Sequence, residues 1–506
     1  MSSYKPDPSK NVNLTIDGFP VTVPEGTTLL EAARKINVII PTLCDCPFLG
    51  RRAVCRLCVV ECDGGRKLSA ACANNVTEGM NVVTNNHRIV NIRKTIVELL
   101  LASHPQECLS CVKSKKCELQ TLAATFGIRT TPFRREAADL RPRITAAETL
   151  VRDASKCVKC GRCVEACQEL QTVRAINSSH RSIRYDIRTP YDQALTEGPC
   201  VFCGQCAAVC PVGAIFEYDQ SAEVWDALGS SERHVVAQLS PAVAAAIERE
   251  FELPPGTITG GKIVTALKRI GFKIVLDAAV SAELTVRKSC GELLDRINNR
   301  RRLPMIVSCS SALTGFTEKN YPELLEHLPS GKRPDQNFGT LAKEDYARVS
   351  GTDISKISSV SIMPCISKKF ESRRPDMETN GIRKVDFALT PQELARLFKT
   401  AGIDFSALPE SPFDSLPETG GLVQPGFAAA LLRGAYKAYT GQTGAPLAFK
   451  EGISESEAEL SGTKVKILVV NGLANARKVM DAIREGTCDA AFVQVISCPA
   501  NAGCGN

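Results

Sequence analysis

Alternating apolar and polar residues near the N-terminus predict a β-hairpin followed by a helix. Residues 11–30, NVNLTIDGFPVTVPEGTTLL, carry apolar side chains at alternating positions on both sides of Asp17-Gly18. This alternation around an Asp-Gly pair is typical of two strands joined by a tight turn. The overlapping segment EGTTLLEAARKINV has the spacing of a capped amphipathic helix. A further amphipathic helix is predicted near residues 87–103.

After about residue 230 the pattern changes to short apolar runs separated by helical stretches, which is typical of α/β folds with buried strands. No GxGxxG or Walker A motif follows a predicted strand, so we expect no flavin or nicotinamide site in this chain. TGGKI at 259–263 is too short for a phosphate-binding loop, and we expect its glycines to form a turn. The predicted strands lie in VVAQLSPAVAAAI, FKIVLDAAV, LPMIVSCS, ISSVSIMPC, KVKILVVNGLA and AAFVQVISC.

The cysteines are concentrated in the first half of the chain. Of 23 cysteines among 506 residues, 17 fall between Cys44 and Cys210. The N-terminus lacks an apolar segment of the signal-peptide type, and no stretch approaches 18 uninterrupted apolar residues. We therefore expect a cytoplasmic chain without a membrane span. Thiols stay reduced in that compartment, which favours metal sites over the alternative, a disulfide framework.

The charged residues form no long run of one sign. The formal net charge is +7, and basic residues are interleaved with acidic ones. This distribution argues against a nucleic-acid partner. A weakly basic surface is compatible with steering an acidic electron carrier such as ferredoxin, or with solubility alone.

The first cysteine group follows the predicted hairpin and helix, an order similar to that of plant-type ferredoxins. Its spacing, C-x10-C-x2-C-x13-C, supplies the four thiolates that a 2Fe-2S cluster requires. Two further cysteines in this region, Cys46 and Cys62, are expected to be spare buried thiols. The predicted ligands are Cys44, Cys55, Cys58 and Cys72.

A histidine begins the next cysteine array. The pattern H-x3-C-x2-C-x5-C comprises His104, Cys108, Cys111 and Cys117. A lone histidine is usually a core or surface residue, but at this spacing we expect it to be the fourth ligand of a 4Fe-4S cluster. A neutral imidazole leaves the cluster less negative than a fourth thiolate would, which should raise its reduction potential.

Two consecutive runs, CVKCGRCVEAC and CVFCGQCAAVCPVGAI, have the duplicated spacing of bacterial two-cluster ferredoxins. In that fold the fourth cysteine of each run ligates the cluster of the other run. Gln168 follows the first run where a proline is usual, a change that removes no ligand. We therefore expect one 4Fe-4S cluster on Cys157, Cys160, Cys163 and Cys210, and another on Cys200, Cys203, Cys206 and Cys167.

The order of these groups, with the α/β region behind them, resembles the large chain of FeFe-hydrogenases across nearly all of the sequence. Three cysteine signatures of that family's catalytic domain have counterparts here, VSCSSALTGF at 307–316, MPCISKKFE at 363–371 and VISCPANAGC at 495–504. The resemblance implies that four cysteines of an active member hold a 4Fe-4S cluster bridged to a diiron unit with CO and cyanide, where hydrogen is made or split. The front end is also similar to the complex I iron-sulfur subunit.

The sequence departs from that family at the cluster ligands. Comparison with the first signature puts Cys309 on the family's proton donor and Ser310 on a ligand. A serine hydroxyl is a hard, high-pKa substitute for thiolate. In the last signature Cys498 and Cys504 are separated by five residues, where the family has C-P-x-x-C. Two interpretations stay open: a remnant 4Fe-4S cluster on Cys309, Cys365, Cys498 and Cys504, or a set of inherited buried thiols.

The family's proton relay and diiron pocket are altered as well. Ser289 stands where active members usually have a glutamate, although Glu292 remains one turn on. Arg333 replaces a small serine, and Ile496 replaces a methionine. Because each change removes a separate requirement of proton reduction, we expect that the domain does not assemble the diiron unit. The pocket residues that remain are Met363 and Lys368, which would contact a cyanide ligand.

Together these patterns predict a multidomain chain of α+β and α/β class. Its four parts are a β-grasp 2Fe-2S ferredoxin domain at 1–86, a helical module with the histidine-ligated 4Fe-4S cluster at 87–140, a bacterial two-cluster ferredoxin domain at 141–228, and an α/β FeFe-hydrogenase-like domain with a degenerate H-cluster at 229–506.

The resemblance implies an electron-relay subunit of a complex of the electron-bifurcating hydrogenase type, which links NAD(P)H and ferredoxin. The expected partners are a flavin-bearing NADH-binding subunit, a small thioredoxin-like 2Fe-2S subunit, ferredoxin, and a separate catalytic subunit such as a NiFe-hydrogenase. The alternatives are an active FeFe-hydrogenase with an unusual H-cluster, and an assembly or sensory protein, which needs no four-cluster wire. A molybdenum-dependent formate dehydrogenase would need a much longer rear domain.

Overall fold

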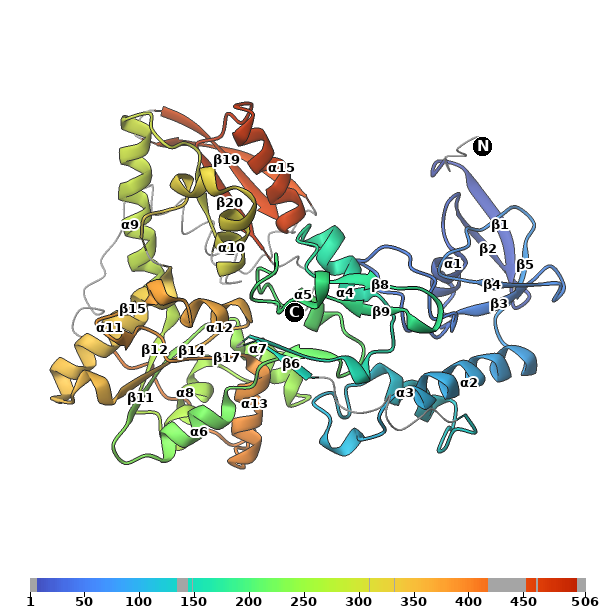
Figure 1. The fold of residues 1–506 in the computed structure, drawn as a ribbon, viewed down its shortest axis with the longest axis horizontal. Coiled ribbons are helices and arrows are strands. Elements are labelled where there is room, and N and C mark those ends of the chain that lie inside the picture. The colour runs from blue at the N-terminus through green and yellow to red at the C-terminus, as the bar shows by residue number, and fades with distance from the viewer. Residues whose placement is uncertain are drawn as a thin grey trace.

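The computed structural model has a front part of short strands and loops and a rear part built on two sheets (Figure 1). The N-terminal sheet lies at the end of the front part that is farthest from the rear part (Figure 1). The residues that the structure describes are 7–133, 144–147, 149–308, 310–331, 333–416, 452–460 and 463–497.

The N-terminal region is a five-stranded sheet, in the order β2-β1-β5-β3-β4, that shares a core with α1. β1 and β2 are antiparallel and are joined by Asp17 and Gly18 with φ angles of 49° and 82°, so the predicted hairpin is confirmed. The Thr28 hydroxyl accepts the Glu31 N–H at 3.1 Å while the Glu31 carboxylate accepts the Thr28 N–H at 2.8 Å, which caps α1 as predicted. The elements are β1 (Asn11–Ile16), β2 (Phe19–Pro24), α1 (Leu29–Lys35), β3 (Val59–Cys62), β4 (Lys67–Ala70) and β5 (Asn81–Val83).

The second region is helical. The Asn86 side chain accepts the Ile89 N–H at 2.8 Å and so caps α2, which matches the predicted second helix within one residue. Its elements are α2 (His87–Ala102), the 3₁₀ turn η1 (Cys108–Ser110) and α3 (Glu118–Thr125).

The third region repeats one loop geometry twice. Lys159 and Gly161 in the first cysteine run have φ angles of 56° and 79°, and Phe202 and Gly204 in the second run have 53° and 75°. Equal conformations at equivalent positions indicate an internal duplication. The elements are β6 (Ile144–Ala146), β7 (Leu150–Asp153), η3 (Ala154–Lys156), α4 (Arg162–Glu165), the π turn η4 (Ala166–Leu170), β8 (Asn177–Ser179), η5 (Ser182–Arg184), β9 (Asp186–Arg188), η6 (Pro190–Asp192), α5 (Gln205–Ala208) and β10 (Ile215–Glu217).

The first rear sheet is parallel throughout, in the order β12-β11-β14-β17. Val235 and Ala237 of β11 pack with four helices on one face, whereas Val236 packs with Phe338 and Ala342 of α11 on the other. Because both faces are covered, the strands appear as uninterrupted apolar runs. The elements are α6 (Ser221–Gly229), β11 (His234–Leu239), α7 (Val243–Glu250), α8 (Gly260–Arg269), β12 (Ile274–Asp277), α11 (Pro334–Ser350), η8 (Ile354–Lys356), β14 (Ile357–Ile362), α12 (Ser367–Ser372), η9 (Pro375–Met377), β15 (Glu378–Thr379), β16 (Ile382–Arg383), β17 (Phe387–Leu389) and α13 (Pro391–Thr400).

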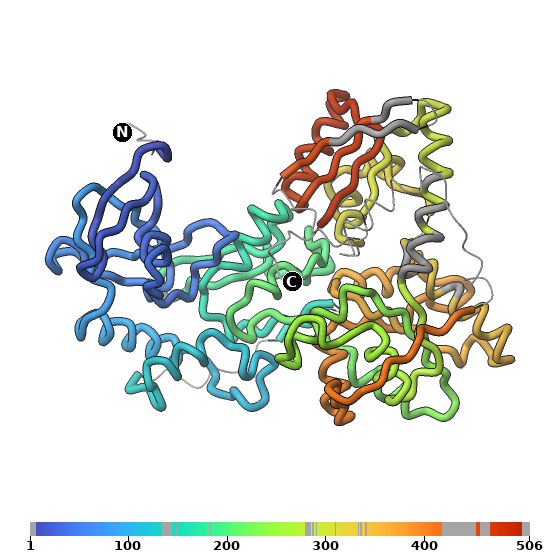
Figure 2. The backbone as a smooth tube through the Cα atoms, turned by 180° about the vertical axis from the view of Figure 1, so that it is seen from behind, coloured from blue at the N-terminus to red at the C-terminus, as the bar shows by residue number. Residues whose placement is uncertain are grey.

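The second rear sheet has the order β13-β20-β19-β18, with β18 antiparallel to its neighbour. α9 runs from the first sheet to the second, so the rear part has two lobes (Figure 2). Phe316 and Val493 of the second lobe share one core with Val201 and Phe202 of the third region. The elements are α9 (Ala278–Asn298), β13 (Met305–Val307), α10 (Ser311–Asn320), η7 (Pro322–His327), β18 (Ile453–Leu460), β19 (Thr463–Asn471), α15 (Leu473–Arg484) and β20 (Phe492–Ile496).

Every predicted apolar run contains a strand, so the α/β prediction is confirmed for this part. The pattern did not show that the strands divide between two sheets, because apolar runs carry no information on pairing. The expectation of a turn at TGGKI was wrong. Gly260 and Gly261 begin α8, whose N-cap is Thr259. A Cβ on Gly261 would lie 3.1 Å from the Ser411 carbonyl oxygen, so this close approach explains the small residue.

Candidate metal centres

The structure brings the four predicted ligands of the 2Fe-2S cluster into mutual contact. We call Cys44, Cys55, Cys58 and Cys72 the first group. The Cys58 thiol donates to the Cys72 sulfur at 3.3 Å. Hydrogen bonds with Cys55 and then Cys72 lower the pKa of Cys44, and the same bonds raise the pKa of Cys55 and of Cys72. The four sulfurs therefore lie within hydrogen-bond reach of one another, as the ligands of one cluster must.

The two other cysteines of this region lie outside the first group. Burial raises the pKa of Cys62, whose side chain bonds with Ser69. Burial also raises the pKa of Cys46, whose charged neighbours are Arg162 and Glu118. Both thiols are therefore protonated at neutral pH and face protein groups rather than the four sulfurs.

His104 is placed as a metal ligand would be. Its side chain is buried, and its Nδ1 atom has no hydrogen-bond partner. Burial lowers the pKa of His104, and the nearby charge of Lys156 lowers it further. The imidazole is consequently neutral at neutral pH, and a neutral imidazole offers a lone pair to a metal.

Three cysteines complete what we call the histidine group, with His104. Burial raises the pKa of Cys117, and the charges of Cys111 and Cys108 raise it further, so the three sulfurs are neighbours. A Cβ on Gly213 would lie only 2.7 Å from the Cys111 sulfur. Gly213 lies in the loop after Cys210, and the histidine group therefore rests directly on the third region.

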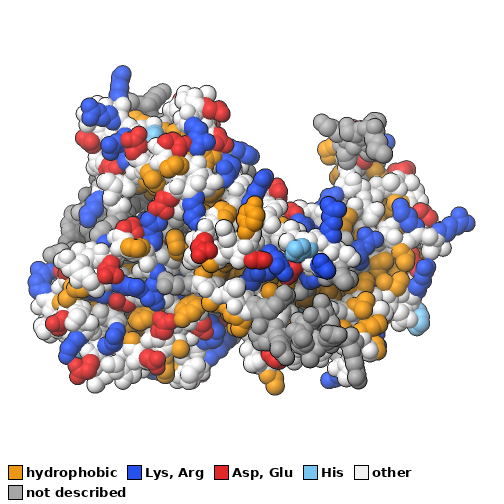
Figure 3. Space-filling view, in the orientation of Figure 1, with side chains coloured by type: hydrophobic (Ala, Val, Ile, Leu, Met, Phe, Trp, Pro, Cys, Tyr) orange, Lys and Arg blue, Asp and Glu red, His pale blue; other side chains and the backbone are white. Residues whose placement is uncertain are grey.

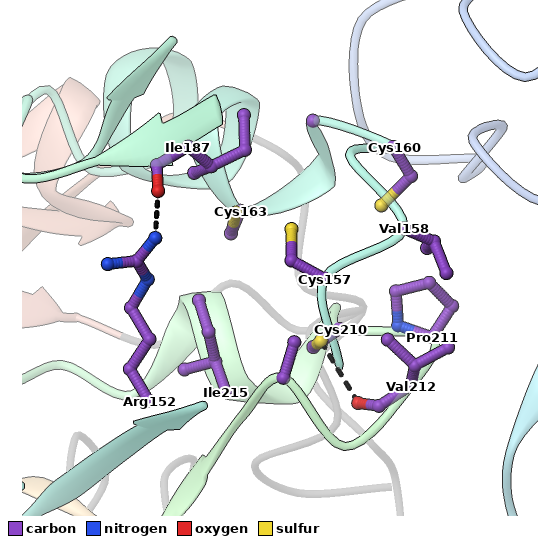
Figure 4. A pocket seen from close by; sticks show the side chains of 12 residues that line it. Arg152, Cys157, Val158, Cys160, Cys163, Ile187, Cys210, Pro211, Val212 and Ile215 are labelled. Carbon is purple, nitrogen blue, oxygen red and sulfur yellow. Dashed lines mark hydrogen bonds between the residues drawn. The ribbon is translucent and has the colours of Figure 1, made fainter. Parts of the chain in front are cut away.

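The middle group, Cys157, Cys160, Cys163 and Cys210, lines a single hollow (Figure 4). The fourth cysteine of the second run thus joins three of the first, as the ferredoxin pattern predicts. Burial raises the pKa of Cys160 to about 12 and that of Cys163 well above its ordinary value. Such buried thiols must lose protons to bind iron, which couples cluster binding to proton release.

The rear group is the reciprocal set, Cys167, Cys200, Cys203 and Cys206. Burial raises the pKa of Cys206 well above its ordinary value, and the charges of Cys203, Cys200 and Cys167 add to the shift. Burial likewise raises the pKa of Cys200 to about 11. Cys167 of the first run therefore lies with three cysteines of the second.

Backbone N–H groups also point at sulfurs in both runs. The Lys159 N–H donates to the Cys157 sulfur at 3.4 Å, and the Phe202 N–H donates to the Cys200 sulfur at 3.4 Å. The left-handed backbone at Lys159 and Phe202 turns these N–H groups inward. N–H donors of this kind stabilise negative charge on a thiolate or cluster.

Among the described residues, no three His, Cys, Asp or Glu side chains lie close enough to hold one metal ion. An iron-sulfur cluster distributes its ligands over several iron atoms, so the four groups suit a cluster better than a single ion. No pair among the cysteines whose side chains the structure describes is joined by a disulfide.

The rear group abuts the second lobe of the rear part and the start of α12. A Cβ on Gly204 would lie 2.8 Å from the Ile366 Cδ1 atom, and Ile366 follows Cys365. The Phe202 ring stacks on Phe370 with centroids 4.4 Å apart. Lys319 donates to the Cys200 carbonyl oxygen at 2.8 Å. The rear group therefore borders the segment of Cys365.

Around Cys365 the polar groups bond with one another. The Cys365 sulfur lies 3.0 Å from the Ser367 hydroxyl, which lies 3.0 Å from the Ser310 hydroxyl. Ser310 is buried and accepts the Ala312 N–H at 3.3 Å as the cap of α10. The hydroxyl at the expected ligand position is thus already occupied by protein contacts. The other expected ligands, Cys309, Cys498 and Cys504, lie outside the described residues.

Lys368 takes part in a buried ion-pair triad. Its Nζ donates to the Glu371 carboxylate at 3.0 Å, and Arg333 pairs with the other oxygen of the same carboxylate. Arg333 also donates to the Thr314 hydroxyl at 2.6 Å. The side chain of Glu371 is completely buried. The triad neutralises the lysine that the resemblance assigns to a cyanide ligand.

Two residues at positions that the resemblance assigns to the proton relay are also buried or bonded to protein groups. Ser289 is buried on α9, and Glu292 accepts from Arg296 at 2.5 Å and from the Ser330 hydroxyl at 2.9 Å. Burial alone would raise the pKa of Glu292, but the bonds from Arg296 and Ser330 outweigh it and lower the pKa. A carboxylate held ionised in this way is a poor proton carrier at neutral pH. The two remaining pocket positions are Met363, half-buried after β14, and Ile496, buried at the end of β20.

Comparison with known families defines the class. The model described as "Iron only hydrogenase large subunit, C-terminal domain" matches residues 233–506, more than half of the chain. The chain therefore belongs to that family. The front part matches a 2Fe-2S iron-sulfur cluster binding domain at 9–87, an NADH-ubiquinone oxidoreductase-G iron-sulfur binding region at 93–132, and a 4Fe-4S dicluster domain at 156–214.

Individual relatives agree with this class. NADP-reducing hydrogenase subunit HndD of Solidesulfovibrio fructosivorans is 38% identical over 96% of this chain and 87% of its own length. Iron hydrogenase 1 of Clostridium pasteurianum is 33% identical over 97% of this chain and 88% of its own length. The alpha subunit of the NADPH-Fe(3+) oxidoreductase of Geobacter sulfurreducens is 34% identical over 40% of this chain and 24% of its own length.

The resemblance stated from the motifs is thereby confirmed, and the chain is an iron-sulfur oxidoreductase of the electron-transfer type. It carries 2Fe-2S and 4Fe-4S binding domains. In the part of the chain that the structure describes, no helix has the length and apolar character to cross a membrane. Basic and acidic side chains are interspersed on the face drawn in Figure 3.

Proposed function

We propose that this chain is the iron-sulfur relay subunit of a multi-subunit oxidoreductase of the electron-bifurcating hydrogenase type. It would carry one 2Fe-2S cluster on the first group and three 4Fe-4S clusters on the histidine, middle and rear groups. The observation that supports the proposal is that neighbouring groups touch. Asp45 of the first group's loop accepts from Arg162 of the middle loop, and Gly213, after Cys210, lies against the Cys111 sulfur. Cys163 lies beside Cys206 of the rear group, whose loop meets Ile366 next to Cys365. Electrons hop between clusters that lie close together, so a continuous series is what a relay requires.

The second half of the proposal is that the rear domain of this chain does not activate hydrogen. Ser310 is committed to the cap of α10 and to Ser367. Arg333 and Lys368, which the resemblance assigns to the diiron pocket, are both paired with Glu371. Glu292 is held by Arg296 and Ser330. Proton reduction needs ligands, an open pocket and a proton path together, and each of these is altered.

The proposed partners follow from the same series. A relay needs a donor and an acceptor, and we propose a flavin-bearing NAD(P)H subunit, a small thioredoxin-like 2Fe-2S subunit and ferredoxin for these roles. A separate catalytic subunit of the NiFe-hydrogenase kind would take over the chemistry that the rear domain lacks. The identity to a subunit of an NADP-reducing hydrogenase over 96% of the chain supports a multi-subunit assembly. The domain limits near residues 86, 140 and 228 remain part of the proposal.

One alternative has specific support. Cys365 and Lys368 are both present and buried, and Iron hydrogenase 1 is similar over nearly the whole chain. An active FeFe-hydrogenase with an unusual H-cluster would show infrared bands of bound CO and cyanide after maturation. The relay proposal expects no such bands.

The decisive experiment is anaerobic purification of the full chain, alone and with its co-purifying partners, followed by iron analysis and hydrogen-uptake assays. The relay proposal expects about 14 iron atoms per chain from the four clusters. It also expects hydrogen-dependent reduction only when partners are present. Hydrogen evolution by the isolated chain would overturn it, and so would an iron-free chain.

A further inference from the structure

One arginine touches the ligand loops of three groups. Arg162 lies in the first run between Cys160 and Cys163, and it is buried. Its two terminal nitrogens donate to the Glu118 carboxylate at 2.6 and 2.8 Å, in the two-bond geometry that fits a guanidinium to a carboxylate. One of these nitrogens also donates to the Asp45 carbonyl oxygen at 2.8 Å.

The two partners of Arg162 lie next to predicted ligands of two other groups. Asp45 directly follows Cys44 of the first group, and Glu118 directly follows Cys117 of the histidine group. Arg162 itself belongs to the middle group's loop. A single side chain therefore fixes the places where two separate cluster groups meet a third. These contacts join residues that are 117 and 44 positions apart along the chain.

The charge of Arg162 lies beside the sulfurs as well as beside Glu118. Its Nε atom is buried and has no hydrogen-bond partner, while Glu118 is half exposed to water. The side chains of Cys160 and Cys46 lie close enough to interact electrostatically with Arg162. A guanidinium stays protonated at any accessible pH. A fixed, buried positive charge beside a cluster favours the more negative, reduced state of that cluster.

A second arginine at the same interface provides a comparison. Arg52 pairs with Glu165 at 2.5 Å, and a Cβ on Gly161 would lie 2.8 Å from its Nε atom. Arg52 thus joins the N-terminal region to the third region, as Arg162 does. The contacts found for it do not include Glu118 or another residue of the histidine group.

We propose that Arg162 is the positioning residue of a junction at which the first group and the histidine group both meet the middle group, and that its charge stabilises an electron on the middle cluster. This inference rests on the proposed function, because it requires the clusters to be present. The clusters of the first group and of the histidine group would then both pass electrons to the middle cluster.

The test is a redox titration of the full chain, monitored by electron paramagnetic resonance, on wild type, Arg162→Gln, Arg162→Lys and Arg52→Gln. In Arg162→Gln the reduced-to-oxidised ratio of the middle cluster at a fixed potential should fall about tenfold, equal to about 59 mV for a one-electron couple. The rear cluster should not move. Arg162→Lys keeps the charge and should keep the middle potential, but it loses the two-bond geometry and should slow electron transfer from the histidine cluster. Arg52→Gln removes a guanidinium from the same loop but no contact with Asp45 or Glu118, so it should leave electron transfer from the histidine cluster unchanged.

The inference is overturned if Arg162→Gln leaves the middle potential in place, shifts all clusters equally, or behaves as Arg162→Lys does. If Arg162→Gln fails to assemble its clusters, Glu118→Gln decides the matter. That variant keeps Arg162 but removes a neighbouring negative charge, so the middle cluster should become easier to reduce, and an unchanged potential contradicts the inference. Wild type without cluster signals would instead overturn the proposed function.

Discussion

The front and rear parts of this protein differ in the burial and the bonding partners of their polar and sulfur groups. In the front part the thiols of Cys163 and Cys206 are buried with strongly raised pKa values, and His104 presents a buried nitrogen without a partner. In the rear part Ser310 bonds with Ser367, and Arg333 pairs with Glu371. A buried imidazole nitrogen without a protein partner, such as Nδ1 of His104, is open to a metal, whereas the Ser310 hydroxyl and the Glu371 carboxylate are engaged by protein groups.

The largest effect that this comparison predicts is the loss of a cluster. Cys163→Ser removes a thiolate from the middle group, and a hydroxyl is a poor substitute for it. We expect the loss of about four iron atoms per chain and of electron transfer from NAD(P)H-side partners to the rear group. Iron analysis and stopped-flow reduction measure both. Cys62→Ser is the matched control and should retain all iron, since Cys62 lies outside the first group. Full iron in Cys163→Ser would refute the ligand assignment.

The next largest expected effect is a decrease in the free energy of unfolding when the ion-pair triad of the rear part is broken. Arg333→Ser leaves the buried Glu371 with Lys368 as its remaining cation, and breaking a buried pair costs about 3 kcal/mol. Urea unfolding of the variant should show this decrease in the free energy of unfolding. Lys356→Ser removes an ion pair with Glu232 on the exposed surface and should leave that free energy unchanged. A stable Arg333→Ser protein would show that the triad does not hold the pocket together.

A moderate effect is expected at the histidine group. His104→Cys replaces a neutral ligand by a thiolate, so the cluster should remain but become harder to reduce, with a reduced-to-oxidised ratio about tenfold lower, or about 59 mV. A redox titration monitored by electron paramagnetic resonance measures the shift. His180→Cys, at an exposed histidine of the third region, serves as the control and should change no potential. An unaltered titration of His104→Cys would remove His104 from the ligand set.

The thiol pKa values predict a smaller, pH-dependent difference between cluster-free and cluster-loaded protein. The thiols of Cys160 and Cys200 have pKa values raised to about 12 and about 11 by burial, above the ordinary value of 9.0. An acid whose pKa is raised on folding stabilises the fold below its unfolded pKa, and this contribution is lost as the pH rises toward the folded value. Cluster-free protein should therefore lose stability between pH 9 and about 11, while cluster-loaded protein should not. Urea midpoints at the two pH values provide the measurement, and equal losses in both forms would contradict the burial of these thiols.

The smallest expected effect is that a restored thiol gives no hydrogen-evolving activity. Ser310→Cys restores the thiol at the position that the resemblance assigns to a ligand, but Arg333 remains paired with the buried Glu371. We expect no hydrogen evolution from this variant after maturation with the diiron precursor, as measured by gas chromatography. Activity from the single substitution would show that the ligand change alone had disabled the site.

Much of the candidate site follows from local sequence. Ligand spacing in a loop such as CVKCGRC determines which sulfurs can reach one cluster, and the Asp17-Gly18 turn and the Thr28 cap depend on neighbours within a few residues. The duplication of two cysteine runs also implies their exchange of fourth ligands. For these features the physical interactions are short in sequence, so the pattern contains them.

The tertiary structure alone decided the remaining features. Nothing in the spacing around Arg162 shows that it reaches Asp45 and Glu118, and nothing near Arg333 shows that it meets Glu371. The division of the apolar strands into two sheets was likewise hidden. These contacts join distant segments, and their energies depend on burial and geometry that arise only when the chain is packed. The sequence by itself determined the ligand types and spacing of each loop, whereas packing determined which loops meet and which charges are paired.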